Sequence, residues 1–279
     1  MESILTFAGA ALYAIAAVLA VSSLVRPGER RERSALILMA AGALPLLAVL
    51  VMRGCRAGCI PSLSRYDALT CYVLATTVVY LLTMASHYTR GIAGILIPYL
   101  TAVLLCAMPA MQMKAGPPPP IQCPWLALHV IAGFAAYAVF SVASVFAAAY
   151  LVQDRNMKRR HLGTLWERLP SLEILDYLMG FLVGVGFLLF SVSIAIGFLL
   201  VHRTAGGNEW FTDPKVMATA AAWSLFAVLV HMRASADRHG RNVAIVTVAG
   251  VICISIAFIG VPLLANSLHA FLKIRAGVN

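Results

Sequence analysis

The feature that most constrains this chain is a succession of apolar runs, each long enough to cross a bilayer. The hydrocarbon holds no water to bond backbone N–H and C=O groups, so an apolar run of about 20 residues crosses it as a helix. The sequence therefore predicts an all-α fold: a polytopic membrane bundle of about eight transmembrane helices, in a single integral membrane domain over residues 1–279. The predicted helices span residues 4–25, 34–52, 66–87, 91–111, 125–152, 175–202, 214–232 and 242–269.

The composition excludes several other classes of protein. Hydrophobic residues make up 61% of the chain and charged residues 11%, which leaves too few polar side chains for a soluble enzyme. The apolar runs are too long for the strands of an outer-membrane barrel. Lys and Arg outnumber Asp and Glu by 21 to 11, but they occur in short groups between the apolar runs, so we expect no nucleic-acid partner. No charged side chain occupies the middle third of a predicted helix, which argues against an ion-coupled transporter.

The basic residues also predict an orientation. Thirteen of the 21 Lys and Arg residues fall on one side of the predicted bundle and 8 on the other. Basic loops resist translocation, so the side with thirteen is predicted to be cytoplasmic. We therefore expect a multi-pass protein of the cell inner (cytoplasmic) membrane with both termini extracytoplasmic. The segments 53–65, 114–124 and 203–214 are predicted to be extracytoplasmic loops.

Two cysteines lie close together in the first of these predicted loops. Cys55 and Cys59 are four residues apart. In an oxidising compartment they form either a disulfide or a pair of thiols, and the spacing alone does not decide between the two.

Two histidines fall near helix ends on the predicted extracytoplasmic side. His129 lies four residues into the helix that starts at residue 125, about 6 Å below the outer start of that helix. His269 ends the eighth predicted helix, which exits on the same side. Neutral imidazole is a common ligand of haem iron, so the two are candidates for a bis-imidazole pair around a cofactor. The alternative for each is an interfacial histidine that binds nothing.

Two further histidines are relevant. His202 ends a predicted helix at the same face and is a competing ligand candidate. His231 lies 17 residues into the helix that begins at Pro214, or about 25 Å along it, which places His231 near the cytoplasmic end.

The segment G-G-N-E-W-F-T-D-P-K at residues 206–215 opens the seventh predicted helix, with Asp213 as a plausible N-cap and Pro214 near the first helical position. Read alone, it is an interfacial aromatic anchor followed by a cap. It also resembles the tryptophan-rich signature of the cytochrome c assembly family of haem-handling membrane proteins, which includes CcsA, CcmC and CcmF. That signature reads roughly W-G-x-x-W-x-W-D-P-K-E, followed by a helix that ends in L-H-x-R. The chain keeps Gly207, Trp210, Asp213, Pro214, Lys215, Trp223 and V-H-M-R at 230–233, and departs at Gly206, Thr212 and Val216.

The resemblance extends beyond the signature. W-L-A-L-H-V at residues 125–130, L-P-S-L-E at 169–173 and the dipeptide Leu268-His269 are similar to family segments in order and spacing. The resemblance therefore implies a cytochrome c assembly-like core over residues 124–271. The similarity is strongest to the small CcsA-like and HemX-like branch.

The resemblance implies a haem b site on the outer face. His129 and His269 would be the axial ligands, with the loop that contains Trp210 and Asp213 beneath the porphyrin, while His231 becomes a candidate inner haem ligand. The implied function is haem handling, export and presentation for covalent attachment to apocytochrome c, beside a ResB/CcsB-like membrane partner. Such a protein is a haem-binding subunit of a cytochrome c synthase rather than a hydrolase or oxidoreductase.

The alternative is a HemX-like membrane regulator or scaffold of haem biosynthesis without an outer haem site. Three departures from the signature favour it: Gly206 and Thr212 replace tryptophans, and Val216 replaces a glutamate.

Overall fold

The structure, a computed structural model, describes residues 1–26, 28–57, 64–86, 91–111, 124–158, 169–204, 213–234 and 240–255. These residues form eight α-helices and one 3-10 turn and contain no strand, which confirms the predicted all-α bundle. Of the helices in these ranges, seven are long and apolar enough to cross a membrane, and α8 is described for 15 residues. The helices are α1 (Glu2–Val25), α2 (Glu29–Ala57), α3 (Arg65–Ser86), α4 (Ala93–Ala107), η1 (Met108–Ala110), α5 (Pro124–Lys158), α6 (Leu172–Thr204), α7 (Pro214–Ala234) and α8 (Arg241–Ser255).

Several helices are longer than the sequence predicts, and α2 and α5 are the clearest cases. α2 begins at Glu29 rather than at residue 34, and α5 continues to Lys158 rather than ending at residue 152. The extra turns are rich in arginine and lysine, which are good helix formers but are not apolar. Hydropathy marks only the part of a helix that lies in hydrocarbon, so it misses turns that continue into the headgroup region.

The predicted loop at 53–65 is also shorter than expected. α2 runs to Ala57, so Cys55 belongs to a helix, where its thiol is free and exposed. Cys59 lies outside the described residues.

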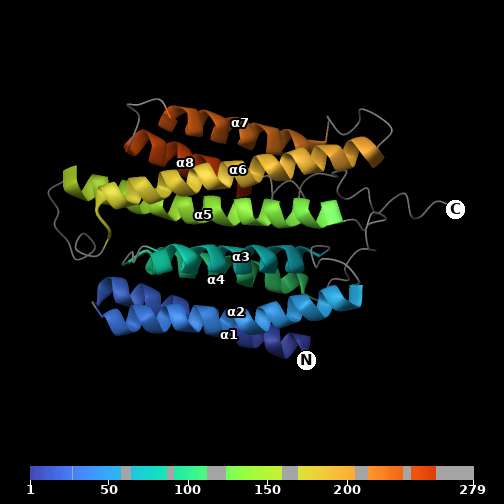
Figure 1. Ribbon diagram of the computed structural model, residues 1–279. Coiled ribbons are helices and arrows are strands. Elements are labelled where there is room, and N and C mark those ends of the chain that lie inside the picture. The colour runs from blue at the N-terminus through green and yellow to red at the C-terminus, as the bar shows by residue number, and fades with distance from the viewer. Residues whose placement is uncertain are drawn as a thin grey trace.

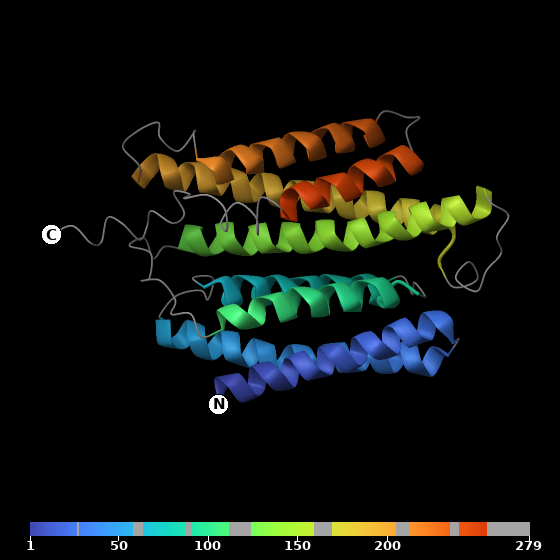
Figure 2. The same ribbon diagram turned by 180° about the vertical axis from the view of Figure 1, so that it is seen from behind.

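Successive helices run in opposite directions. They form two groups, α1–α4 and α5–α8, as the two views in Figures 1 and 2 show. The N-terminus, the end of α2 and the starts of α3, α5 and α7 lie at one end of the bundle, here called the N-terminal face. The other end is called the opposite face. α5 packs against α6 and α8 in its own group and against α3 in the other, so it joins the two halves.

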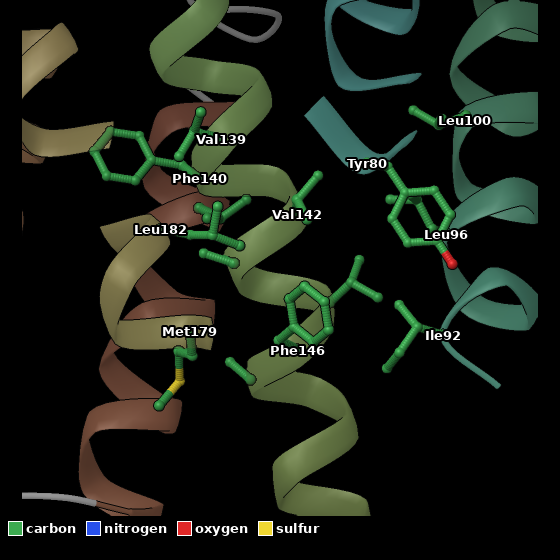
Figure 3. Close-up of a cluster of buried hydrophobic side chains, with 14 of the residues drawn as sticks. Tyr80, Ile92, Leu96, Leu100, Val139, Phe140, Val142, Phe146, Met179 and Leu182 are labelled. Carbon is green, nitrogen blue, oxygen red and sulfur yellow. The ribbon is translucent and has the colours of Figure 1, made fainter. Parts of the chain in front are cut away.

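The core is centred on α5. Phe140 and Phe146 are fully buried, and Figure 3 shows the α5 side chains between Met179 and Leu182 on one side and Tyr80, Ile92 and Leu96 on the other. The ring of Phe140 stacks on Phe226 of α7 at a centroid distance of 3.8 Å. Lipid tails are as apolar as these side chains, so close packing rather than the hydrophobic effect holds such helices together.

A hydroxyl cluster reinforces the contact between the two halves. The Tyr72 hydroxyl on α3 lies 2.6 Å from the Tyr99 hydroxyl on α4 and 2.6 Å from Ser141 Oγ on α5. Ser141 Oγ in turn donates to the main-chain carbonyl of Tyr137 at 2.7 Å. A hydrogen-bonded hydroxyl inside a membrane protein has few alternative partners, so this cluster fixes how α3 and α5 meet.

We predict that Tyr72 and Ser141 are energetically coupled. Tyr72→Phe and Ser141→Ala each remove the shared bond, so the double variant should lose less stability than the sum of the two single variants. The expected coupling is about 0.6 kcal/mol, typical of such bonds in membrane proteins. Denaturation of the purified protein in detergent provides the measurement, and strictly additive losses would contradict the prediction.

Candidate functional site

The described part of the chain contains three of the five predicted site residues. His129 and Asp213 lie at the N-terminal face, on the first turns of α5 and at the start of α7. His231 lies on the last turn of α7, toward the opposite face. Trp210 and His269 lie outside the described residues, so their roles stay predictions.

The imidazole of His129 is held by the neighbouring helix α6. Its Nδ1 lies 2.8 Å from the main-chain oxygen of Ser193. A carbonyl oxygen can only accept a hydrogen bond, so Nδ1 carries the proton and the Nε2 of the neutral ring keeps its lone pair. In the described part of the chain, all hydrogen bonds of this ring are made by Nδ1. This tautomer is the one in which histidines bind metals through Nε2.

Ser193 makes a second contact with the same residue. Its Oγ donates to the main-chain oxygen of His129 at 3.0 Å and lies 3.3 Å from Nδ1. Ser193 therefore fixes both the backbone and the ring of His129. The pair is separated by 64 residues, so no local sequence pattern identifies Ser193; the only signal is a hydroxyl residue within a long apolar helix.

Asp213 caps α7, as its position before Pro214 predicts. Its Oδ1 accepts from the backbone N–H of Lys215 at 2.7 Å and lies 3.4 Å from that of Val216, and the side chain is buried. A carboxylate here satisfies N–H groups that have no partner within the helix and complements the helix dipole. The first turn of α7, with Asp213 and Lys215, therefore begins at the same end of the bundle as the first turns of α5, which carry His129.

His202 does not join His129, although both lie toward the same face. It follows Ser193 by nine residues, which places it about 13 Å farther along α6 and half a turn around the helix. Its side chain is exposed, and its ring stacks on Phe198 with a centroid distance of 6.2 Å and an interplanar angle of 1°. His202 therefore shares no contact with the Ser193 carbonyl that holds His129, and its place as a competing ligand candidate stays a prediction.

At the opposite face, α7 is clamped to α6 close to His231. The Arg233 guanidinium lies 3.2 Å from Asp176 Oδ2 and donates to the Asp176 main-chain oxygen at 3.1 Å. The backbone N–H of Gly240 donates to Asp176 Oδ1 at 3.0 Å. Gly180 makes room for this arrangement, because a Cβ there would lie 2.0 Å from Arg233 Cζ. The His231 side chain, two residues before Arg233, is exposed.

A second charge cluster ties the N-terminal helices together at the N-terminal face. Arg53 Nε lies 3.2 Å from Glu2 Oε2, its Nη1 lies 3.1 Å from Asp67 Oδ1, and its Nη2 donates to the Met111 main-chain oxygen at 3.0 Å. The guanidinium also covers the ring of Tyr66 at 4.7 Å. The sequence predicts only a basic extracytoplasmic residue here. Arg53 instead joins α1, α2, α3 and the end of η1.

Fold and site together define a polytopic helical membrane protein with an imidazole available to a transition metal at one end of the bundle. The family model described as cytochrome C assembly protein matches residues 62–269. The chain therefore belongs to the cytochrome c assembly protein family, as its signature residues predict. Its role lies in cytochrome c biogenesis, and the family implies haem handling, an apocytochrome c client and membrane partners.

Individual relatives agree with this assignment. The chain is 32% identical to the cytochrome c biogenesis protein CcsA of Synechococcus sp. (strain CC9902), over 90% of this chain and 89% of that protein. A CcsA of Synechococcus sp. (strain CC9605) is 30% identical, over 96% of this chain and 95% of the relative. The CcsA of Chlamydomonas reinhardtii is 25% identical, over 84% of this chain and 67% of the relative.

A solved structure has the same fold. The cytochrome c haem lyase CcmF superposes with a TM-score of 0.65 at 15% sequence identity. The alignment covers 99% of this chain and 51% of the lyase, so the chain spans about half the length of that protein. At this identity the likeness concerns the fold alone.

We predict that Asp213 stabilises the start of α7 mainly as a hydrogen-bond acceptor and less through its negative charge. Asp213→Ala should lower the free energy of unfolding by about 1 kcal/mol because two backbone N–H groups lose their acceptor. Asp213→Asn keeps an acceptor oxygen and should retain most of that stability. Thermal denaturation in detergent checks both variants. Equal losses for Ala and Asn would show that the carboxylate charge, rather than the cap, stabilises this turn.

Proposed function

We propose that this protein is the CcsA-like component of cytochrome c biogenesis, which receives haem b and presents it for covalent attachment to apocytochrome c. The observation that carries the proposal is the hydrogen bond from His129 Nδ1 to the Ser193 carbonyl, which leaves Nε2 available to iron. His129 and His269 are the proposed axial ligands at the N-terminal face. Trp210 precedes Asp213 by three residues in the sequence, and Asp213 starts α7 at the same face as His129.

The proposed division of labour follows from the chemistry of the bound group. Haem supplies the reactive vinyl groups and the redox-active iron, and the protein holds and orients it until a client is present. His129 contributes a ring of fixed tautomer and orientation. Lys215, on the first turn of α7 at the same end of the bundle, is the proposed partner of an anionic group of the haem.

The proposed orientation puts the N-terminal face and both termini on the extracytoplasmic side of the cytoplasmic membrane, where the thirteen-to-eight distribution of basic residues places them. His231 then lies in the inner half of the membrane and is the proposed inner ligand. Because its side chain is exposed on α7, a ligand from another chain can complete that site. The proposed partner is a ResB/CcsB-like membrane protein.

The test compares two histidines toward the same face. Protein purified in detergent from haem-replete cells should show the low-spin spectrum of a bis-imidazole haem. His129→Ala should abolish that spectrum and reduce cytochrome c maturation about 10-fold or more, since a ligand is lost outright. His202→Ala tests the competing candidate at the same face, and the proposal expects it to leave both readouts unchanged because the His202 side chain is exposed and half a turn around α6 from Ser193.

Three outcomes would count against the proposal. A colourless wild-type protein would contradict haem binding, and so would a His129→Ala variant with an unchanged spectrum. A deletion strain with altered haem precursor levels but normal cytochrome c content would instead support the HemX-like alternative.

A further inference from the structure

The carbonyl that holds His129 already belongs to the hydrogen-bond ladder of α6. Within an α-helix the main-chain oxygen of Ser193 faces the N–H of Gly197, four residues later. The oxygen has a second lone pair, which is free to accept another donor. In most helices this lone pair is hard to reach, because each Cα–Cβ bond tilts toward the helix N-terminus and the side chain at position i+4 lies over the carbonyl at position i.

At position 197 the covering side chain is missing. A Cβ built on Gly197 would lie 2.8 Å from His129 Cε1, 3.0 Å from Nδ1 and 3.7 Å from Nε2. Contacts between carbon atoms at such distances are repulsive, since the optimum is about 3.5–4.0 Å. The imidazole of His129 therefore occupies the space that a methyl group at position 197 would fill.

Glycines allow close approach at other points of α6 too, since a Cβ on Gly186 would lie 2.8 Å from the Phe140 ring of α5. A Cβ on Gly133 of α5 would lie 3.2 Å from Ser193 Oγ, so a second missing side chain lets Ser193 reach the His129 backbone. Gly184, also on α6, would meet nothing within 4 Å. Gly184 therefore offers a matched position on α6 where an added methyl group meets no neighbour, unlike Gly197, where it meets His129.

We propose that Gly197 is a positioning residue for His129. By leaving the Ser193 carbonyl uncovered, it allows the Nδ1 hydrogen bond that sets the tautomer and the plane of the ring. This inference deepens the proposed haem-binding function and rests on it for its consequence at the iron. The steric relation between residue 197 and the His129 imidazole does not depend on a bound ligand.

The consequence for a ligand follows from the chemistry of metal-bound histidines. When the ring nitrogen that does not bind the metal donates a hydrogen bond to a carbonyl, the bond orients the ring and makes the metal-binding nitrogen more basic. Loss of such an outer contact lowers metal affinity by about 10–100-fold. An alanine at position 197 would push the ring away from the Ser193 carbonyl and remove this contact while leaving both candidate axial histidines in the chain.

The first experiment tests the steric relation in the absence of haem. Gly197→Ala and Gly184→Ala are made in the wild-type chain and in a His129→Ala background, and thermal stability is measured in detergent. Alanine is a better helix former than glycine, so neither change weakens α6 by its backbone preference. We expect Gly197→Ala to lower the melting temperature of the wild-type chain but not of the His129→Ala chain. Equal effects in the two backgrounds would overturn the inference.

The second experiment measures haem binding by the same purified proteins. Gly197→Ala should lower haem affinity about 10-fold or more and reduce the low-spin fraction of the spectrum. Gly184→Ala should match the wild type, and Ser193→Ala, which keeps the carbonyl, should lose less than Gly197→Ala. The inference is wrong if Gly197→Ala binds haem like Gly184→Ala while His129→Ala does not bind. If His129→Ala binds haem normally, the proposed function fails instead, and the stability comparison still decides the steric relation.

Discussion

The packing of α5 against both halves of the bundle is the contact on which the rest of the structure depends. Phe140 and Phe146 are fully buried on this helix, and Figure 3 shows its side chains directed toward α6 on one side and toward α3 and α4 on the other. In lipid such packing must be close, because no hydrophobic effect drives helices together. The same close approach of α5 to α6 brings His129 to the backbone of α6. The candidate site therefore depends on the packing that also forms the core.

Charged groups complete the bundle at its two ends, where water and headgroups begin. Arg53 joins four elements at the N-terminal face, and the pair of Arg233 and Asp176 joins α6 to α7 at the other. Both arginines are partly shielded from solvent, so their charges are compensated by hydrogen bonds as well as by carboxylates. These clusters fix helix ends at the two faces of the bundle, and the second lies close to His231 in the sequence.

Hydropathy was sufficient to predict the helices, because the bilayer permits little else for an apolar run of this length. It misplaced the start of α2 and the end of α5, where arginine and lysine continue a helix beyond the hydrocarbon. The cap by Asp213 was predictable because it is made within three residues. The contact between His129 and Ser193 was not, since it depends on how two helices that are apolar on nearly all sides rotate against each other. The role of Gly197 opposite His129 can be inferred only once that rotation is known.

The central claim is that His129 binds iron through Nε2 while α6 holds Nδ1. A cryo-electron microscopy structure of the haem-loaded protein tests it most directly. We expect iron bonded to Nε2 of His129, with Nδ1 still at hydrogen-bond distance from the Ser193 carbonyl. Iron bonded to other residues, or a His129 ring turned away from Ser193, would contradict it.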